Sequence, residues 1–103
     1  MAENIRLSAP ALRVLKVFVE KPREQRSGAE ISRTASVGAG TLYPLLARLE
    51  HAGWLTSEWE MVDPAEAGRP RRRFYRLTAV GQAAAVKEIG DVQVLPGALA
   101  WNS

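Results

Sequence analysis

The stretch that decides the fold runs from Gly40 to Gly53 and reads GTLYPLLARLEHAG. Successive residues of an α-helix turn by about 100°, which places the four leucines of this stretch within roughly 60° of one another. They predict the buried face of a helix, and Gly53 is predicted to end that helix as its C′ glycine. The four apolar positions are Leu42, Leu45, Leu46 and Leu49.

The opposite face of this helix carries small and polar side chains. It consists of Gly40, Pro44, Ala47, Arg48 and His51, with Thr41 at its edge and Tyr43 on its flank. A proline removes one backbone hydrogen bond inside a helix but none in the first turn. Two helix starts are compatible with the sequence. Pro44 loses a bond to the Gly40 carbonyl if the helix begins at Gly38, and loses none if Thr41 is the N-cap.

The residues before this helix predict a shorter helix and a tight turn. Ser27 and Glu30 match a capping box, in which each side chain satisfies the other residue's backbone donor. The short helix is expected to reach about Ala35, and the small residues Ser36 to Gly40 are expected to form the turn. Such a pair is a helix-turn-helix, unless it is only an ordinary pair of packed helices in an all-α domain.

An earlier helix is predicted from Ser8, as its N-cap, to Glu20. Pro10 falls in the first turn, where its missing donor costs nothing. The apolar face of this helix is expected to consist of Leu12, Leu15, Phe18 and Val19. The charged residues 21–26 that follow include a proline and predict a loop.

After Gly53 the period of the pattern changes from helical to alternating, which predicts a strand from Trp54 to about Val62. Residues 63–70 are rich in turn formers and predict a loop, and Arg73–Leu77 is the expected returning strand. A β-hairpin directly after a helix-turn-helix is the order of a winged helix. Thr78 is predicted to cap a last, alanine-rich helix from Ala79 to about Ile89, ended by Gly90.

Composition excludes several classes of protein. With 103 residues the chain is expected to form one small domain, and without cysteine it has neither disulfides nor thiolate metal sites. No apolar run reaches the roughly 18 residues of a membrane span, and the N-terminus lacks the apolar core of a signal peptide, so a cytoplasmic protein is expected. One histidine and no convergent carboxylates leave no acid–base or metal constellation, so an enzyme is not expected.

The distribution of positive charge is more informative than the net charge of +3. A dense arginine run predicts contact with a polyanion, although a solvated loop is the alternative. Five of the 14 lysines and arginines fall within eight positions, at Arg69, Arg71, Arg72, Arg73 and Arg76.

With these motifs in place, the chain resembles the PadR family of transcriptional regulators. The resemblance rests on Gly40–Leu46, on Arg48-Leu49-Glu50 and Gly53, on Gly68-Arg69-Pro70-Arg71, and on Phe74–Thr78 with Gly81. It covers about Ser8 to Ile89. It implies a mostly α fold with a small β-hairpin, a winged helix-turn-helix with a C-terminal dimerisation helix. Residues 1–78 would form the DNA-binding domain and residues 79–103 the dimerisation helix and tail.

The resemblance also implies a function, a sequence-specific DNA-binding regulator, usually a repressor, that binds double-stranded DNA as a homodimer without a cofactor. Two recognition helices would enter successive major grooves, leading with their N-terminal residues. The residues expected to contact DNA are Gly40, Thr41, Tyr43, Pro44 and Arg48 of the recognition helix and Arg69, Arg71 and Arg72 of the wing. Neither the operator, the regulated genes nor a small-molecule effector can be read from the sequence.

Other roles compete at several positions. Tyr43 is a DNA contact or a partly buried packing residue, and His51 is expected to act as a cation at the helix C-terminus. Trp54 and Trp59 are expected to pack in the core or hairpin, and Trp101 to anchor the apolar tail at the dimer interface. One of Arg73 and Arg76 is expected to pair with Glu58 or Glu60 across the hairpin. The alternative function is a winged-helix module that binds an acidic protein partner and no DNA.

Overall fold

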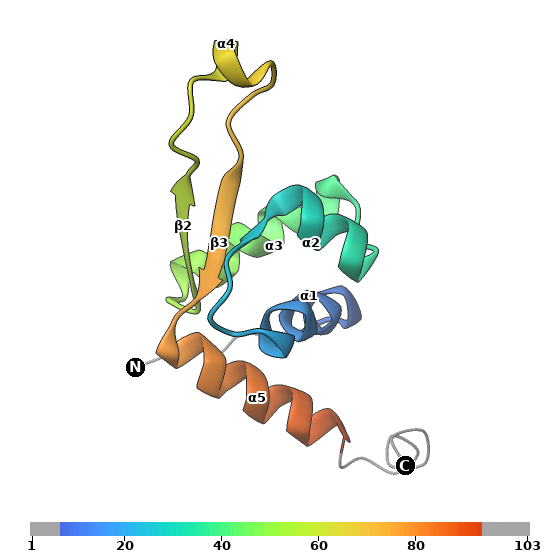
Figure 1. The fold of residues 1–103 in the computed structure, drawn as a ribbon. Coiled ribbons are helices and arrows are strands. Elements are labelled where there is room, and N and C mark those ends of the chain that lie inside the picture. Colours follow the sequence, from blue (N-terminus) through green and yellow to red (C-terminus); the bar gives the residue numbers. More distant parts are fainter. Residues whose placement is uncertain (1–6, 94–103) are drawn as a thin grey trace.

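A computed structural model of the chain describes residues 7–93, and their side chains as far as residue 90. The apolar tail with Leu95, Leu99 and Trp101, predicted to lie at a dimer interface, is outside the described residues. Figure 1 shows a group of helices packed together, a hairpin that projects away from them, and the last described helix along the opposite side.

Helix α1 spans Ala9–Glu20 and begins as predicted, with the Ser8 hydroxyl accepting a hydrogen bond from the Ala11 N–H at 3.3 Å. Its buried face is shifted from the predicted one, since Leu12 and Val19 are only half-buried. The shift is a rotation by about one residue, because α2 and α5 both pack against α1 and together select the side that is covered. The buried positions are Ala11, Val14, Leu15, Val17 and Phe18.

Helix α2 spans Gly28–Ala35, as predicted, but only half of the expected capping box forms. The Ser27 hydroxyl accepts from the Glu30 N–H at 3.1 Å. The Glu30 carboxylate instead binds the Arg26 guanidinium at 2.7 Å, because Arg26 is buried and needs a partner for its charge. A bond of Arg13 Nε to the Ala35 carbonyl, 3.0 Å, ties the end of α2 to α1.

The turn between α2 and the recognition helix is shorter than predicted. Helix α3 spans Ala39–His51 with Gly38 as its N-cap, so the turn is Ser36, Val37 and Gly38 alone. Ser36 is the one non-glycine residue with positive φ in the described part of the chain, at 55°. This left-handed residue ends α2, and Val37 is buried beneath the turn.

Helix α3 ends as the sequence predicts. Gly53 has a φ of 84°, the Gly53 N–H bonds the Glu50 carbonyl at 3.0 Å, and the Trp54 N–H bonds the Leu49 carbonyl at 2.9 Å. These two bonds form a Schellman motif, in which a glycine adopts the left-handed conformation at low cost. The chain then reverses directly into the hairpin, with Leu49 and Trp54 both buried.

Strands β2 (Leu55–Trp59) and β3 (Arg73–Leu77) form the predicted antiparallel hairpin, with Leu55 opposite Leu77 and Trp59 opposite Arg73. The sequence did not predict two further elements. A two-residue strand, β1 (Arg26–Ser27), begins at the end of the predicted loop of residues 21–26. It pairs with β3 and completes a sheet of order β1-β3-β2. A single helical turn, α4 (Pro64–Ala67), lies at the tip of the hairpin, capped by the Asp63 carboxylate.

Helix α5 spans Ala79–Gln93 and continues through Gly90, where the sequence predicted its end. A glycine ends a helix only where it adopts the left-handed conformation, and Gly90 does not. The helix is capped by Thr78 as predicted, since the Thr78 hydroxyl accepts from the Gly81 N–H at 2.9 Å. The same hydroxyl donates to the Gly53 carbonyl at 2.6 Å, which ties the start of α5 to the end of α3.

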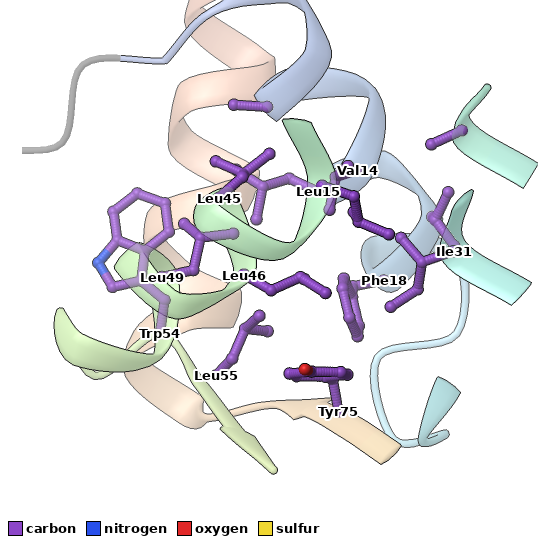
Figure 2. Close-up of a cluster of buried hydrophobic side chains, with 14 of the residues drawn as sticks. Val14, Leu15, Phe18, Ile31, Leu45, Leu46, Leu49, Trp54, Leu55 and Tyr75 are labelled. Atoms are coloured by element: carbon purple, nitrogen blue, oxygen red, sulfur yellow. The ribbon is translucent and has the colours of Figure 1, made fainter. Parts of the chain in front are cut away.

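One core lies between α1, α2, α3 and the base of the sheet, as Figure 2 shows. All four leucines of α3 are buried in it. Figure 2 shows Leu45, Leu46 and Leu49 in one cluster with Phe18, Ile31 and Tyr75. Trp54 is buried as predicted, whereas Trp59 lies on the hairpin with 54% of its surface exposed. The order α1-β1-α2-α3-β2-β3-α5 is that of a winged helix-turn-helix, in which the hairpin β2–β3 with its connection, residues 60–72, is the wing.

Candidate nucleic-acid interface

The face of α3 opposite the leucines is open along its whole length. Every residue that the sequence placed there is exposed in the structure, while the leucines are buried. The exposed set is Gly40, Thr41, Tyr43, Pro44, Ala47, Arg48 and His51. This face therefore makes no contribution to the core and is available to a partner.

The N-terminal end of α3 is built from residues with little or no side chain. Gly38 caps the helix through its backbone alone, with its carbonyl accepting from Thr41 and Leu42 at 3.0 and 2.8 Å. Pro44 therefore lies within the helix, not in its first turn, and the Gly40 carbonyl loses the donor four residues on. Gly40 is exposed, so water or a ligand can satisfy that carbonyl, and the cost is small.

Tyr43 is positioned by a glycine on the preceding helix. A Cβ atom added to Gly28 would lie 2.5 Å from the Tyr43 hydroxyl oxygen and 2.8 Å from its Cε1. The phenol ring therefore rests against the start of α2, while 46% of the residue remains exposed. The packing role considered for Tyr43 is therefore confirmed, and its DNA contact stays a prediction.

The wing is joined to α3 by a polar network at its base. The Ser57 hydroxyl donates to the Glu50 carboxylate at 2.6 Å and accepts from Arg73 Nε and Nη2 at 3.0 and 2.8 Å. Arg73 also lies 3.8 Å from the Glu50 carboxylate and stacks over Trp59, with its Cζ 5.1 Å from the ring centre. Arg73 thus pairs with Glu50 of α3, and the predicted pairing of Arg73 or Arg76 with Glu58 or Glu60 across the hairpin is wrong.

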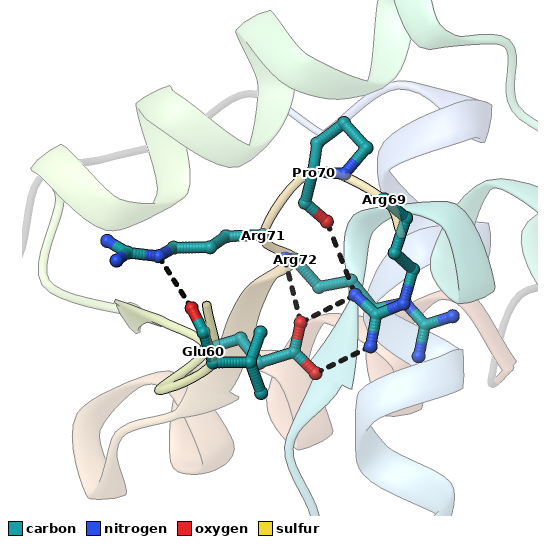
Figure 3. Close-up of polar contacts among 6 residues, drawn as sticks. Glu60, Arg69, Pro70, Arg71 and Arg72 are labelled. Atoms are coloured by element: carbon teal, nitrogen blue, oxygen red, sulfur yellow. Dashed lines mark hydrogen bonds and ion pairs between the residues drawn. The ribbon is translucent and has the colours of Figure 1, made fainter. Parts of the chain in front are cut away.

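The wing arginines differ in what they contact, as Figure 3 shows. Both Nη atoms of Arg69 bind the Glu60 carboxylate, at 2.7 and 3.0 Å, so this side chain is engaged within the wing. Arg71 donates through Nε to the Val62 carbonyl at 3.0 Å, and Arg72 is exposed. The hydrogen bond from Arg69 is the largest cause that lowers the pKa of Glu60 to about 2, and it raises the pKa of Arg69.

A cleft of about 600 Å³ separates α3 from the wing. Three arginines and one glutamate give it an excess of positive charge, and Tyr75 lies at its floor, where burial raises the pKa of the phenol. The excess of positive charge in the lining suits an anionic partner. The walls include Tyr43, Ala47 and Glu50 of α3 and Arg71, Arg72 and Arg73 of the wing.

The cleft brings together three of the predicted site residues, Tyr43, Arg71 and Arg72. Gly40, Thr41, Pro44 and Arg48 lie on the exposed face of α3 outside the cleft lining, and Arg69 is bound to Glu60.

The structure adds three residues that the sequence did not single out for this surface: Gly28, Glu50 and Glu60. Gly28 could have been noticed in the sequence, because it directly follows the N-cap Ser27 and a glycine inside a helix lowers its stability. Glu50 stands in the family motif and Glu60 was expected to pair with Arg73 or Arg76, but their actual partners, Arg73 for Glu50 and Arg69 for Glu60, depend on how the wing folds.

Other kinds of site are not found in the described part of the chain. Among residues 7–90 no group of histidine, aspartate and glutamate side chains is arranged to hold a metal ion. None of the helices described there is long and apolar enough to cross a membrane.

Comparison with known proteins identifies the family of the chain. The sequence model of the transcriptional regulator PadR-like family matches residues 19–87. The chain is 48% identical over 60 residues to the transcriptional regulator Rv3488 of Mycobacterium tuberculosis, a match that covers 57% of this chain and 51% of that protein. The chain therefore spans about half the length of this curated relative.

Two solved structures show the same fold over most of the chain. A PadR family transcriptional regulator from Eggerthella lenta superposes with a TM-score of 0.69 at 27% identity, covering 89% of this chain and 81% of that one. NadR, solved in complex with 4-hydroxyphenylacetate, gives a TM-score of 0.64 at 25% identity, over 82% of this chain and 54% of that one. The family is one of transcriptional regulators and not of enzymes. By its sequence and its fold, this chain belongs to the PadR-like family of transcriptional regulators.

Proposed function

We propose that the chain is a sequence-specific DNA-binding repressor that acts in the cytoplasm as a homodimer. The observation that carries the proposal is the exposed face of α3, with small and hydroxyl side chains at its N-terminal end and an arginine-bearing wing across a cleft from it. Small residues let the backbone approach phosphates and base edges, and a helix that enters a major groove leads with these residues.

Each of the proposed DNA contacts has a chemical role. Gly40 and Pro44 supply a flat surface without long side chains, and Thr41 and Tyr43 supply hydroxyl donors to phosphate. Arg48 is long enough to reach a phosphate or a guanine edge. Arg71 and Arg72 extend from the wing toward the phosphates that flank the groove.

The proposal is tested by selecting bound sequences from random duplexes and then measuring affinity for a selected duplex across a salt series. Phosphate contacts give a linear fall of log K with log salt, with a slope of about −0.9 for each phosphate neutralised. Replacing Arg71 by Gln should weaken binding and make this slope less steep by about 1. Arg23→Gln in the α1–β1 connection is the matched control. Failure to prefer any selected duplex over random DNA would refute the proposal and favour the protein-interaction alternative.

The proposed dimer uses residues 79–103, with residues 1–78 as the DNA-binding domain. A stripe of small apolar residues runs along α5 at helical spacing and is exposed or half-exposed: Ala79, Ala83, Val86 and Gly90. Small residues let two helices approach closely over such a stripe. Light scattering at micromolar concentration should give the mass of a dimer, and Ala83→Glu should give a monomer. Gln25→Glu, which adds the same charge at an exposed position in the α1–β1 connection, should leave the dimer intact.

A further inference from the structure

A carboxylate lies where the connection of the wing begins, on a surface otherwise rich in arginine. Glu60 lies one residue beyond β2, and its side chain is only 16% exposed. Its Oε1 and Oε2 accept from the two Nη atoms of Arg69 at 2.7 and 3.0 Å, and Oε1 also accepts from the Arg72 N–H at 3.2 Å. The Glu60 N–H donates to the Arg72 carbonyl at 2.8 Å. Glu60 thus holds the loop of residues 61–71 at both of its ends.

Charge alone gives no reason for this residue. A carboxylate on a DNA-facing surface repels phosphate and cancels one of the arginines beside it. The geometry gives a different reason, because two parallel N–H···O bonds between arginine and carboxylate fix the orientation of both side chains. Eleven loop residues would otherwise sample many conformations, and ordering them when DNA arrives would reduce the affinity.

The arginines beside Glu60 divide into two kinds. Both Nη atoms of Arg69 donate hydrogen bonds to Glu60, and Nη1 also donates to the Pro70 carbonyl at 3.2 Å. Arg71 uses only Nε within the wing, on the Val62 carbonyl, and is exposed. Figure 3 shows its guanidinium directed away from the pair formed by Glu60 and Arg69. Among the arginines of the connection, residues 60–72, Arg71 and Arg72 are the ones whose guanidinium groups the wing itself does not occupy fully.

We propose that Glu60 is a positioning residue, which through Arg69 holds the wing in the shape that presents Arg71 and Arg72 to DNA. The Arg69 guanidinium then binds the Glu60 carboxylate and does not bind a DNA phosphate. This inference rests on the proposed DNA binding, and it reverses the expectation from charge. Removing the negative charge of Glu60 should weaken DNA binding, although the protein becomes more positive.

The first measurement needs no DNA. Trypsin can cut after Arg71 and Arg72 only when the wing opens locally, so the cutting rate in the free protein reports the order of the wing. Glu60→Gln should raise that rate about tenfold, because a bidentate bond to a charged group is lost. Glu58→Gln, which removes the same charge from an exposed position on β2, should leave the rate unchanged. Circular dichroism verifies that both variants are folded.

The second measurement is the affinity for a duplex selected by the wild-type protein. Glu60→Gln should bind about tenfold more weakly, and Glu58→Gln as tightly as the wild type or more tightly. Arg69→Gln should reproduce both effects of Glu60→Gln, and the double variant should be no worse than either single one, because the two residues act as a unit. Arg71→Gln should weaken binding with little change in the trypsin rate at Arg72.

Two results would overturn the inference. One is an unchanged trypsin rate in Glu60→Gln. The other is binding by Glu60→Gln as tight as that of Glu58→Gln, which would show that only charge matters. If the wild type selects no duplex, the proposed function fails and the DNA role of Glu60 with it. The trypsin comparison is then still decisive for whether Glu60 orders the wing.

Discussion

Replacing Gly81 by alanine should destabilise the protein strongly, because of a contact at the corner where α5 leaves the sheet. A Cβ atom at this position would lie 2.0 Å from the Trp54 carbonyl oxygen and 2.7 Å from its carbonyl carbon. These are backbone atoms, which cannot turn away as a side-chain end can. Since real Cβ contacts are essentially never shorter than 3.0 Å, α5 must move from the α3–β2 corner by about 1 Å or more.

That movement has a calculable cost. The Thr78 N–H bonds the same Trp54 carbonyl at 3.0 Å, so a shift of about 1 Å breaks a bond worth about 1 kcal/mol. Overpacking adds about 1–3 kcal/mol to the free-energy cost of the substitution, and the better helix propensity of alanine lowers that cost by up to about 1 kcal/mol. We therefore expect Gly81→Ala to lower the free energy of unfolding by about 2 kcal/mol. For a domain of this size, that is a fall in Tm of about 8–16 °C.

The assay is urea unfolding followed by circular dichroism, at one fixed protein concentration because a dimer's stability depends on it. Gly40→Ala is the matched control, since it makes the same change inside a helix, α3, away from the proposed dimer stripe and with nothing within 4 Å of the new Cβ. It should raise the free energy of unfolding by about 0.5–1 kcal/mol. The reasoning is refuted if Gly81→Ala is within about 0.5 kcal/mol of the wild type, or if both variants change stability in the same direction.

Three further predictions concern the turn, the recognition helix and the wing. Ser36→Gly should stabilise the protein by about 0.5 kcal/mol in the same urea assay, because Ser36 has a φ of 55° and glycine adopts this conformation without strain; a loss of stability would contradict this. Gly28→Ala should displace the Tyr43 ring, and because the nearest atom is the hydroxyl at the end of the side chain, the Tm should change little. Fluorescence anisotropy should show weaker binding to a selected duplex. Unchanged affinity would argue against a DNA contact by Tyr43. The pKa of Glu60 is lowered from 4.5 to about 2, so folding favours its ionised form. The wild type should therefore be more stable than Glu60→Gln by the full amount above about pH 4.5, and this difference should disappear toward pH 2. A difference that grows as the pH falls would contradict the prediction.

The sequence by itself determined the order of the main elements and the two faces of the recognition helix. The leucine spacing of residues 42–49 requires one buried face, and the exposure of Thr41, Pro44 and Arg48 follows from it by angle. Local signals were also sufficient at Ser8, Gly53 and Thr78, because a cap is decided by residues within one turn of it. The family motifs made the regulator assignment readable without coordinates.

Only the tertiary structure decided what depends on residues far apart in the chain. The start of α3 at Ala39, which places Pro44 inside the helix, was not fixed by local signals because Gly38 caps without a side chain. Strand β1 exists only because β3 lies beside it, and the side of α1 that is buried depends on α2 and α5. The partners of Arg69 and Arg73 depend on where the wing folds, and charge acts through space rather than along the sequence.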